Sequence, residues 1–290
     1  MNKYFSILPC LVFSAFLLPS ATFAASPLKA DISAGYTYDD NVTRAELDQD
    51  IEKDSILNLD ATARYNIPFN DKSYFSIKGS LELNKYLDFD KLSNNRIGIH
   101  GSYHLRPFDG YTASKYFARI AYVQRLYNSD QRTGSATYLQ LGWSKRLTDV
   151  VTLFAGYIKE NIDSDESIGV FDADNNRLYL EADFKTGKNN TLYTTLTYFD
   201  GDIVSTTAPN SDIINAARPF IVRDDAFLEL TPNRFAYRLS AKTTSIKLGD
   251  TYAIRSNQAI DASVFYYKAD SDYGITYTGL IANLNYLYRF

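Results

Sequence analysis

Apolar and polar residues alternate one by one over long stretches of this chain. In the segment 55–67, the odd positions from Leu57 to Ile67 are apolar, and the even positions from Asn58 to Asn66 are polar or charged. The segment 73–85 repeats this pattern. A period of two places the two kinds of side chain on opposite faces of a β-strand, whereas a helix would spread them around its circumference. The pattern therefore predicts amphipathic strands.

About twelve segments follow this pattern, and most of them are about ten residues or longer, which matches a tilted membrane crossing. Their expected bounds are 29–38, 55–67, 73–85, 95–106, 115–127, 135–147, 150–161, 176–186, 190–200, 234–247, 258–268 and 275–290. An even number of strands returns both chain ends to the periplasmic side. We predict an all-β fold, a single antiparallel up-and-down transmembrane β-barrel of about 12 strands (range about 10–14), with both termini periplasmic. The range reflects the segment 201–257, where the alternation fades.

The connections between these segments differ in length. Those at 68–72, 148–149 and 187–189 are short, whereas those at 39–54 and 163–175 are longer and acidic. Short periplasmic turns and long outer loops are typical of outer-membrane barrels.

The longest connection, 201–233, contains Arg218, Arg223 and three prolines. It either folds inward and narrows the pore or stands outward as a recognition surface, and the sequence does not choose between these two arrangements.

The first residues of the chain have the pattern of a secretory signal peptide. Lys3 precedes an apolar stretch at 5–18, and small residues follow up to Ala24. We therefore expect cleavage after residue 24 and a barrel domain at 25–290. Cys10, the single cysteine, would leave with the signal, so the mature chain would have no disulfide and no thiol chemistry. No later stretch approaches 18 apolar residues, so a membrane crossing requires a closed barrel.

The last strand carries a motif at the end of the chain. Tyr286, Tyr288 and Phe290 share its apolar face. A final strand of this kind that ends in Phe resembles the signal recognised by the barrel assembly machinery of Gram-negative outer membranes. The resemblance implies that machinery as a partner during biogenesis. The 24 tyrosines fit aromatic belts at the membrane–water boundaries, so we also expect contact with outer-membrane lipid and lipopolysaccharide.

Positive charge is concentrated on the polar faces of the expected strands, although the whole chain has a net charge of −4. If the apolar faces meet lipid, these residues line the lumen. A basic strip is expected from Arg96, His100, His104, Arg106, Lys115, Arg119 and Arg125, and further lumen cations from Arg64, Lys78, Arg146, Arg177, Arg234, Arg238 and Lys242. Basic pore linings favour anions. In an alternative interpretation these cations pair with Asp60, Glu82, Glu181 and Asp183 and make the barrel rigid.

We expect no enzymatic activity, catalytic residue, cofactor, metal site or nucleic-acid partner. His100 and Ser102 share a strand face, as a hydrolase pair could, but they fall in the middle of a strand inside the expected lumen. A barrel protease of the omptin type needs histidine near its outer rim, and neither histidine lies in an expected outer loop.

Two functions remain open from the sequence. The first is a passive diffusion channel that passes anions or acidic oligosaccharides, and small twelve-stranded channels for such sugars are similar in strand number and basic lumen. The second is a barrel that does not transport and acts in surface attachment or assembly. The segment 35–42 (GYTYDDNV) resembles the first strand and loop of barrels in surface-lipoprotein assembly modifiers and in some exopolysaccharide-associated outer-membrane proteins.

Overall fold

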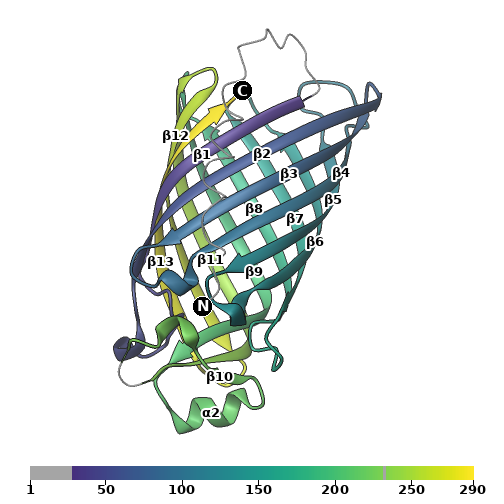
Figure 1. Ribbon diagram of the computed structural model, residues 1–290. Helices are drawn as coiled ribbons and strands as arrows, with labels where there is room; N and C mark the ends of the chain where they lie inside the picture. Colours follow the sequence, from purple (N-terminus) through teal and green to yellow (C-terminus); the bar gives the residue numbers. More distant parts are fainter. Residues whose placement is uncertain (1–27, 231–232) are drawn as a thin grey trace, which may run out of the picture.

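The computed structural model describes residues 28–230 and 233–290, which form one β-barrel (Figure 1). The expected signal peptide, 1–24, lies outside the described residues. The strands are β1 (Leu28–Asp39), β2 (Asp54–Asn70), β3 (Ser73–Tyr86), β4 (Asn94–Leu105), β5 (Lys115–Tyr127), β6 (Gly134–Arg146), β7 (Val151–Ser164), β8 (Ala173–Lys185), β9 (Asn190–Thr207), β10 (Ile221–Arg223), β11 (Phe235–Arg255), β12 (Gln258–Ser271) and β13 (Thr276–Arg289).

All of these strands except β10 close into the barrel wall. Each pairs antiparallel with its neighbours in the order β11-β12-β13-β1-β2-β3-β4-β5-β6-β7-β8-β9, and β9 then pairs with β11. The predicted twelve-stranded up-and-down barrel is therefore confirmed. Both the first described residue, Leu28, and the last residue, Phe290, lie at one end of the barrel, which we call the termini end. The opposite end carries the helix α2 (Ser211–Ala217), and we call it the capped end.

The alternation in sequence becomes an inside and an outside. Leu57 and Leu59 of β2 point outward and are 50% and 40% exposed, while Asn58 between them bonds to inward residues of neighbouring strands. Ile97 and Ile99 of β4 repeat this arrangement. An apolar outer face and fully paired strands satisfy both requirements of a bilayer interior. Among the described residues, no helix has the length and apolarity needed to cross a membrane.

The strands β9 and β11 extend beyond the others at the capped end. β11 is 21 residues long, and its first residues pair with β9 on one side and with the short strand β10 on the other. Over this extension the inward face is apolar. Tyr237 and Leu239 are buried there against Ile213 of α2.

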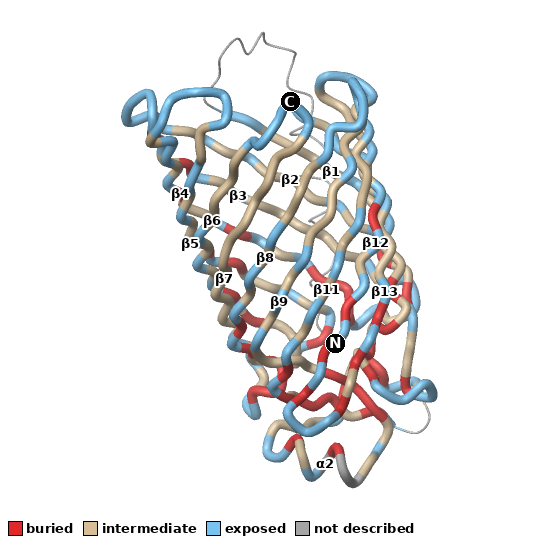
Figure 2. The backbone as a smooth tube through the Cα atoms, turned by 180° about the vertical axis from the view of Figure 1, so that it is seen from behind, coloured by how far each residue is buried: buried red, intermediate tan, exposed pale blue. Residues whose placement is uncertain are grey.

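Burial is concentrated at this end of the molecule (Figure 2). Three clusters of buried apolar side chains lie there: one around Tyr237 and Tyr277, one around Phe227, and one around Val170. The wall toward the termini end is mostly half-buried or exposed.

Several inward aromatic rings lie against glycines on the neighbouring strand. The ring of Phe117 covers Gly142, and the ring of Tyr193 covers Gly249 so closely that a methyl group at either glycine would overlap it. Glycine at these positions lets the rings lie against the wall, a device known for stabilising paired strands.

Candidate functional site: a charged lumen with a covered mouth

A cluster of positive charge lies on the inner wall near the termini end. Arg64 on β2 is directly opposite Lys78 on β3, which is opposite His100 on β4. Arg119 on β5 interacts electrostatically with Arg64 and with Lys78, although two strands separate β2 from β5. Only side chains that point into the lumen can meet in this way. The structure thus brings together three of the predicted lumen cations and both predicted histidines, and we call this set (Arg64, Lys78, His100, His104, Arg119) the basic cluster.

These charges have few negative partners. In the described part of the chain, no carboxylate oxygen lies within 4.0 Å of a side-chain nitrogen of Arg64, Lys78 or Arg119. Arg119 instead donates to the amide oxygen of Gln140 at 3.2 Å. Unpaired cations in a membrane pore attract anions because the low-dielectric wall focuses their field.

Aromatic rings flank the basic cluster. The imidazole of His104 is stacked on Tyr74, with 4.5 Å between ring centroids, and also lies 5.8 Å from the ring of Phe117. Arg119 in turn lies over Phe117, and Ser102 bonds to the Nε2 atom of His104 at 2.9 Å. These ring contacts fix the orientation of His104 and Arg119 without placing a negative charge beside them.

Arg96 and Arg125 also point inward but lie closer to the capped end. Both donate to the hydroxyl of Tyr127, and Arg96 additionally lies 3.7 Å from Glu82. Arg96 is therefore partly compensated, as in the rigid-barrel interpretation, whereas Arg125 is bonded to a hydroxyl group.

Three further residues of the predicted basic lining lie at the rim of the termini end. Arg106 donates to the carbonyl of Gly110, and Arg146 lies over the ring of Tyr111. Lys115 and Arg146 share a hollow of about 300 Å³ beneath this turn. They would meet a solute at the entrance rather than within the lumen.

Of the remaining predicted lumen cations, Arg177 lies in the lumen, whereas Arg234, Arg238 and Lys242 do not. Arg177 points inward and pairs with Glu160 at 3.7 Å. Arg234 is buried at the capped end, where it pairs with Asp50 at 2.9 Å. The register of β11 places Arg238 and Lys242 on the face opposite to Tyr237 and Leu239, and hence outside the lumen.

The placement of Arg238 and Lys242 differs from the sequence-based expectation because the inward face of β11 changes character. Its inward residues are apolar near α2, and they become polar only further along the strand. Lys247 is the inward cation of this strand. The sequence reasoning missed it, although the flanking outward residues Ile246 and Leu248 give the required signal.

An acidic group lies on the wall opposite the basic cluster. Glu181 on β8 accepts from Thr195, and Asp261 on β12 accepts from Thr251 and Tyr193. Asp183 lies one inward position beyond Glu181 and interacts with it electrostatically. We call these three residues the acidic wall.

A segment at the capped end crosses the mouth of the barrel. Residues 224–230, which we call the strap, leave the wall between β9 and β11. In the ring of strands, the turn η3 (Asp90–Leu92) between β3 and β4 is diametrically opposite that point. Phe227 of the strap nevertheless packs on Leu92 and Phe89 at this turn. The extended ends of β9 and β11 and the strap together therefore cross the mouth, from the β9–β11 side to η3.

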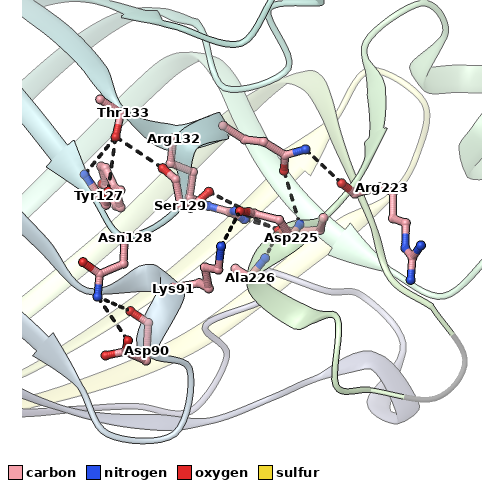
Figure 3. Close-up of polar contacts among 12 residues, drawn as sticks. Asp90, Lys91, Tyr127, Asn128, Ser129, Arg132, Thr133, Arg223, Asp225 and Ala226 are labelled. Carbon is pink, nitrogen blue, oxygen red and sulfur yellow. Dashed lines mark hydrogen bonds and ion pairs between the residues drawn. The ribbon is translucent and has the colours of Figure 1, made fainter. Parts of the chain in front are cut away.

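Ion pairs fix the strap to the turns it reaches (Figure 3). The guanidinium of Arg132 makes a bidentate pair with Asp224, with both N–O distances at 2.7 Å. Asp225 accepts from Ser129 at 2.6 Å and lies 3.4 Å from Lys91. Bidentate pairs of this kind combine strength with a fixed geometry.

The first loop contributes a second layer to the cover. Thr43 and Arg44, in the connection between β1 and β2, accept hydrogen bonds from Thr206 and Ser205 at the end of β9. The buried Asp50 of the same loop pairs with Arg234. Of the two arrangements considered for the long connection after β9, the structure shows the inward one, although Arg218 and Arg223 are exposed and do not enter the mouth.

Asp224 is charged despite being fully buried. Burial opposes the charged form, but the Arg132 guanidinium and the bonds from Thr206 and the Ala226 N–H outweigh it, so the pKa of Asp224 lies below its ordinary value of 3.8. The strap is thus fastened at neutral pH by a charged group that is inaccessible to solvent.

Tyr286, Tyr288 and Phe290 lie at the end of β13. Tyr286 and Phe290 are exposed, and the ring of Tyr288 packs edge-on against Phe290. β13 also pairs with β1, so this strand closes the sheet between the two ends of the chain. The role of these residues as an assembly signal stays a prediction. Among the described residues, no group of three or more His, Cys, Asp or Glu side chains is arranged to hold a metal ion.

Comparisons with known proteins give the fold but no close relative. No protein-family model and no curated protein sequence matches this chain. A crystal structure of an outer membrane channel from Pseudomonas putida F1 is similar over 91% of this chain and 95% of that one, with a TM-score of 0.56 and 10% identity. The KdgM porin in complex with disordered oligogalacturonate covers 90% of this chain and 99% of its own at a TM-score of 0.46 and 10% identity. The chain thus has the fold of outer-membrane β-barrel channels.

Proposed function

We propose that this protein is a passive channel of the Gram-negative outer membrane that favours anions, and that its outer mouth is closed by the strap at rest. The observation that carries the proposal is the basic cluster, whose three strongest cations face the lumen without a carboxylate partner. A structural ion-pair network would have placed acids beside them. The barrel fold and the apolar outer face support the membrane location.

The favoured cargo in this proposal is a small anion or an acidic oligosaccharide. Guanidinium groups bind carboxylates and phosphates through two parallel hydrogen bonds, and Arg64 and Arg119 would supply them. In this orientation the capped end faces the cell exterior and the termini end faces the periplasm, so that the long connections are outside.

The test is the reversal potential of the refolded protein in a planar bilayer under a salt gradient. Lys78→Gln/Arg119→Gln is compared with a matched control, Lys242→Gln/Lys268→Gln, which removes two cations from the outward face. Two unit charges at about 8 Å in water change the energy of an anion by about 1 kcal/mol. We therefore expect the double variant Lys78→Gln/Arg119→Gln to have an anion preference about fivefold lower than that of the wild type. The control should leave it unchanged.

Recordings are made on the wild type and on a variant with a released strap, Arg132→Ala, so that a closed mouth is not mistaken for the absence of a pore. Equal selectivity in the lumen pair and the control would refute the role of the basic cluster.

The covered mouth also favours a second candidate, a barrel that does not transport and acts in surface attachment or assembly. Its exterior would then be the ordered surface formed by α2 and the first loop. A folded protein that stays silent in both the wild type and the strap-released variant would support this function and reject the channel.

A further inference from the structure

The acidic wall lies across the lumen from the basic cluster. In the ring of strands, β6 and β7 separate β5 from β8 on one side, and β1 and β13 separate β2 from β12 on the other. β8, which carries Glu181 and Asp183, is therefore as far from one edge of the basic cluster as β12, which carries Asp261, is from the other. The midpoint between β8 and β12 is diametrically opposed to the midpoint of the basic cluster.

Both groups also lie at the same end of the barrel. Arg64, Lys78 and Arg119 lie four to six residues from the ends of their strands at the termini end, and the three carboxylates lie two to four residues from theirs. No ion pair joins the two groups among the described residues. Opposite charges that stay apart at one level produce a field across the lumen.

The acidic wall keeps most of its charge. Lys247 lies two strands from Glu181 in the same row, because both residues are opposite Thr195 in the register. Its Nζ atom is 5.4 Å from the ring of Tyr193, and it makes no ion pair in the described structure. Lys185 lies at the rim, at the last position of β8. Glu181 and Asp261 bond only to hydroxyl groups, which leave their negative charge uncompensated.

We propose that the cargo of this lumen carries both charges: a small solute with a carboxylate or phosphate that meets the basic cluster and an ammonium group that meets the acidic wall. This inference rests on the proposed function and names its solute class. A solute with both groups gains attraction from each wall, whereas a simple anion is attracted by one wall and repelled by the other. A transverse field also orients such a solute during passage.

The experiment measures binding of ω-amino acids to the refolded full-length mature protein by ligand-observed NMR titration at low salt. 4-Aminobutyrate and 6-aminohexanoate are each compared with butyrate and hexanoate, which lack only the amine. Binding does not require an open strap if the solute enters from the termini end. We expect each amino acid to bind about fivefold tighter than its matched acid.

Glu181→Gln/Asp183→Asn tests the acidic wall, and Asp200→Asn/Asp270→Asn removes two acids from the outward face as a control. The lumen variant should lose the preference and bind the plain acids at least as well as the wild type, while the control keeps the preference. A wild type that binds amino acids and plain acids equally, or a preference that survives in the lumen variant, overturns the inference.

The two proposals fail in different ways. Plain acids that bind and depend on Lys78 and Arg119, without any preference for the amine, leave the anion channel standing and remove only the inference. Failure of every carboxylate to bind overturns the inference together with the proposed basic site.

Discussion

The two ends of this barrel hold their charges in opposite ways. At the capped end, Arg132 is buried and matched to Asp224 in a bidentate pair. In the lumen near the termini end, Lys78 and Arg119 lie among other cations, and no carboxylate of the described residues comes within 4.0 Å of either. The first arrangement stabilises one conformation, whereas the second is tolerated because the closed sheet holds the strands in place. The comparison indicates where the chain is organised for closure and where for interaction with a solute.

The largest effect should come from breaking the matched pair. Arg132→Ala leaves Asp224 buried without its partner, which typically costs about 3–5 kcal/mol. The cost falls on the closed strap rather than on the barrel, so the open population should rise by about a hundredfold or more. Single-channel recording should show frequent openings where the wild type is mostly closed.

Lys85→Ala is the control for this change, because Lys85 on β3 makes an exposed pair with Asp90 of η3 at the same end of the barrel. Exposed pairs contribute about 0–1 kcal/mol, so its recordings should match the wild type. Equal behaviour of the two variants would contradict the role of Arg132 as the fastening of the strap.

Acid should release the strap less completely. Because the pKa of Asp224 in the closed state lies below its ordinary value of 3.8, its charge stabilises the strap fully above about pH 5, and this stabilisation is lost as the pH falls through the lower value. Openings should therefore increase only below about pH 4. Protonated Asp224 can still accept hydrogen bonds, so the effect is smaller than that of Arg132→Ala.

The control for the acid response is Asp224→Asn, which should open equally at neutral and acidic pH. An increase in openings centred near pH 6 would instead indicate a histidine and would contradict the role given to Asp224.

The smallest effect should come from removing a cation of the basic cluster. Lys78→Gln relieves repulsion from Arg64 and Arg119 and weakens only the attraction to Glu82. We expect the free energy of unfolding of the barrel to stay the same or to rise by less than about 1 kcal/mol. Urea unfolding followed by heat-modifiable mobility on gels would measure it, and a clear loss of stability would show that Lys78 is a structural residue.

Most of the wall could be predicted from the sequence, because lipid outside and water inside impose a period of two on every crossing. The expected segment 115–127 coincides with β5, and the others differ from the observed strands mainly at their ends. The period-two pattern no longer identifies the inner face where the strand leaves the membrane and its outer side no longer meets lipid. Beyond the membrane, Tyr237 and Leu239 of β11 point inward onto α2, while the polar Arg238, Ser240 and Lys242 point outward. The apolar face is the inner one here, which is the reverse of the membrane-spanning wall.

The same cause limited the candidate site. Arg64, Lys78 and Arg119 can be predicted because their strands alternate clearly. The sequence predicts the wrong face for Lys242, because the apolar face of β11 changes sides along the strand. The pair of Arg132 and Asp224 joins residues 92 positions apart and leaves no local pattern. The basic cluster and the acidic wall face each other because of the order of the strands around the ring. No single segment of the sequence shows this order.

The glycines beneath the inward rings have a consequence for what size of molecule fits. Because Phe117 and Tyr193 lie flat over Gly142 and Gly249, each ring takes little of the cross-section. An alanine at either glycine would tilt its ring toward the axis and narrow the bore, with no charge altered. The width of the lumen at these two rings therefore depends on the absence of a Cβ atom at Gly142 and Gly249. Substitutions there would change the width without changing any charge of the lumen.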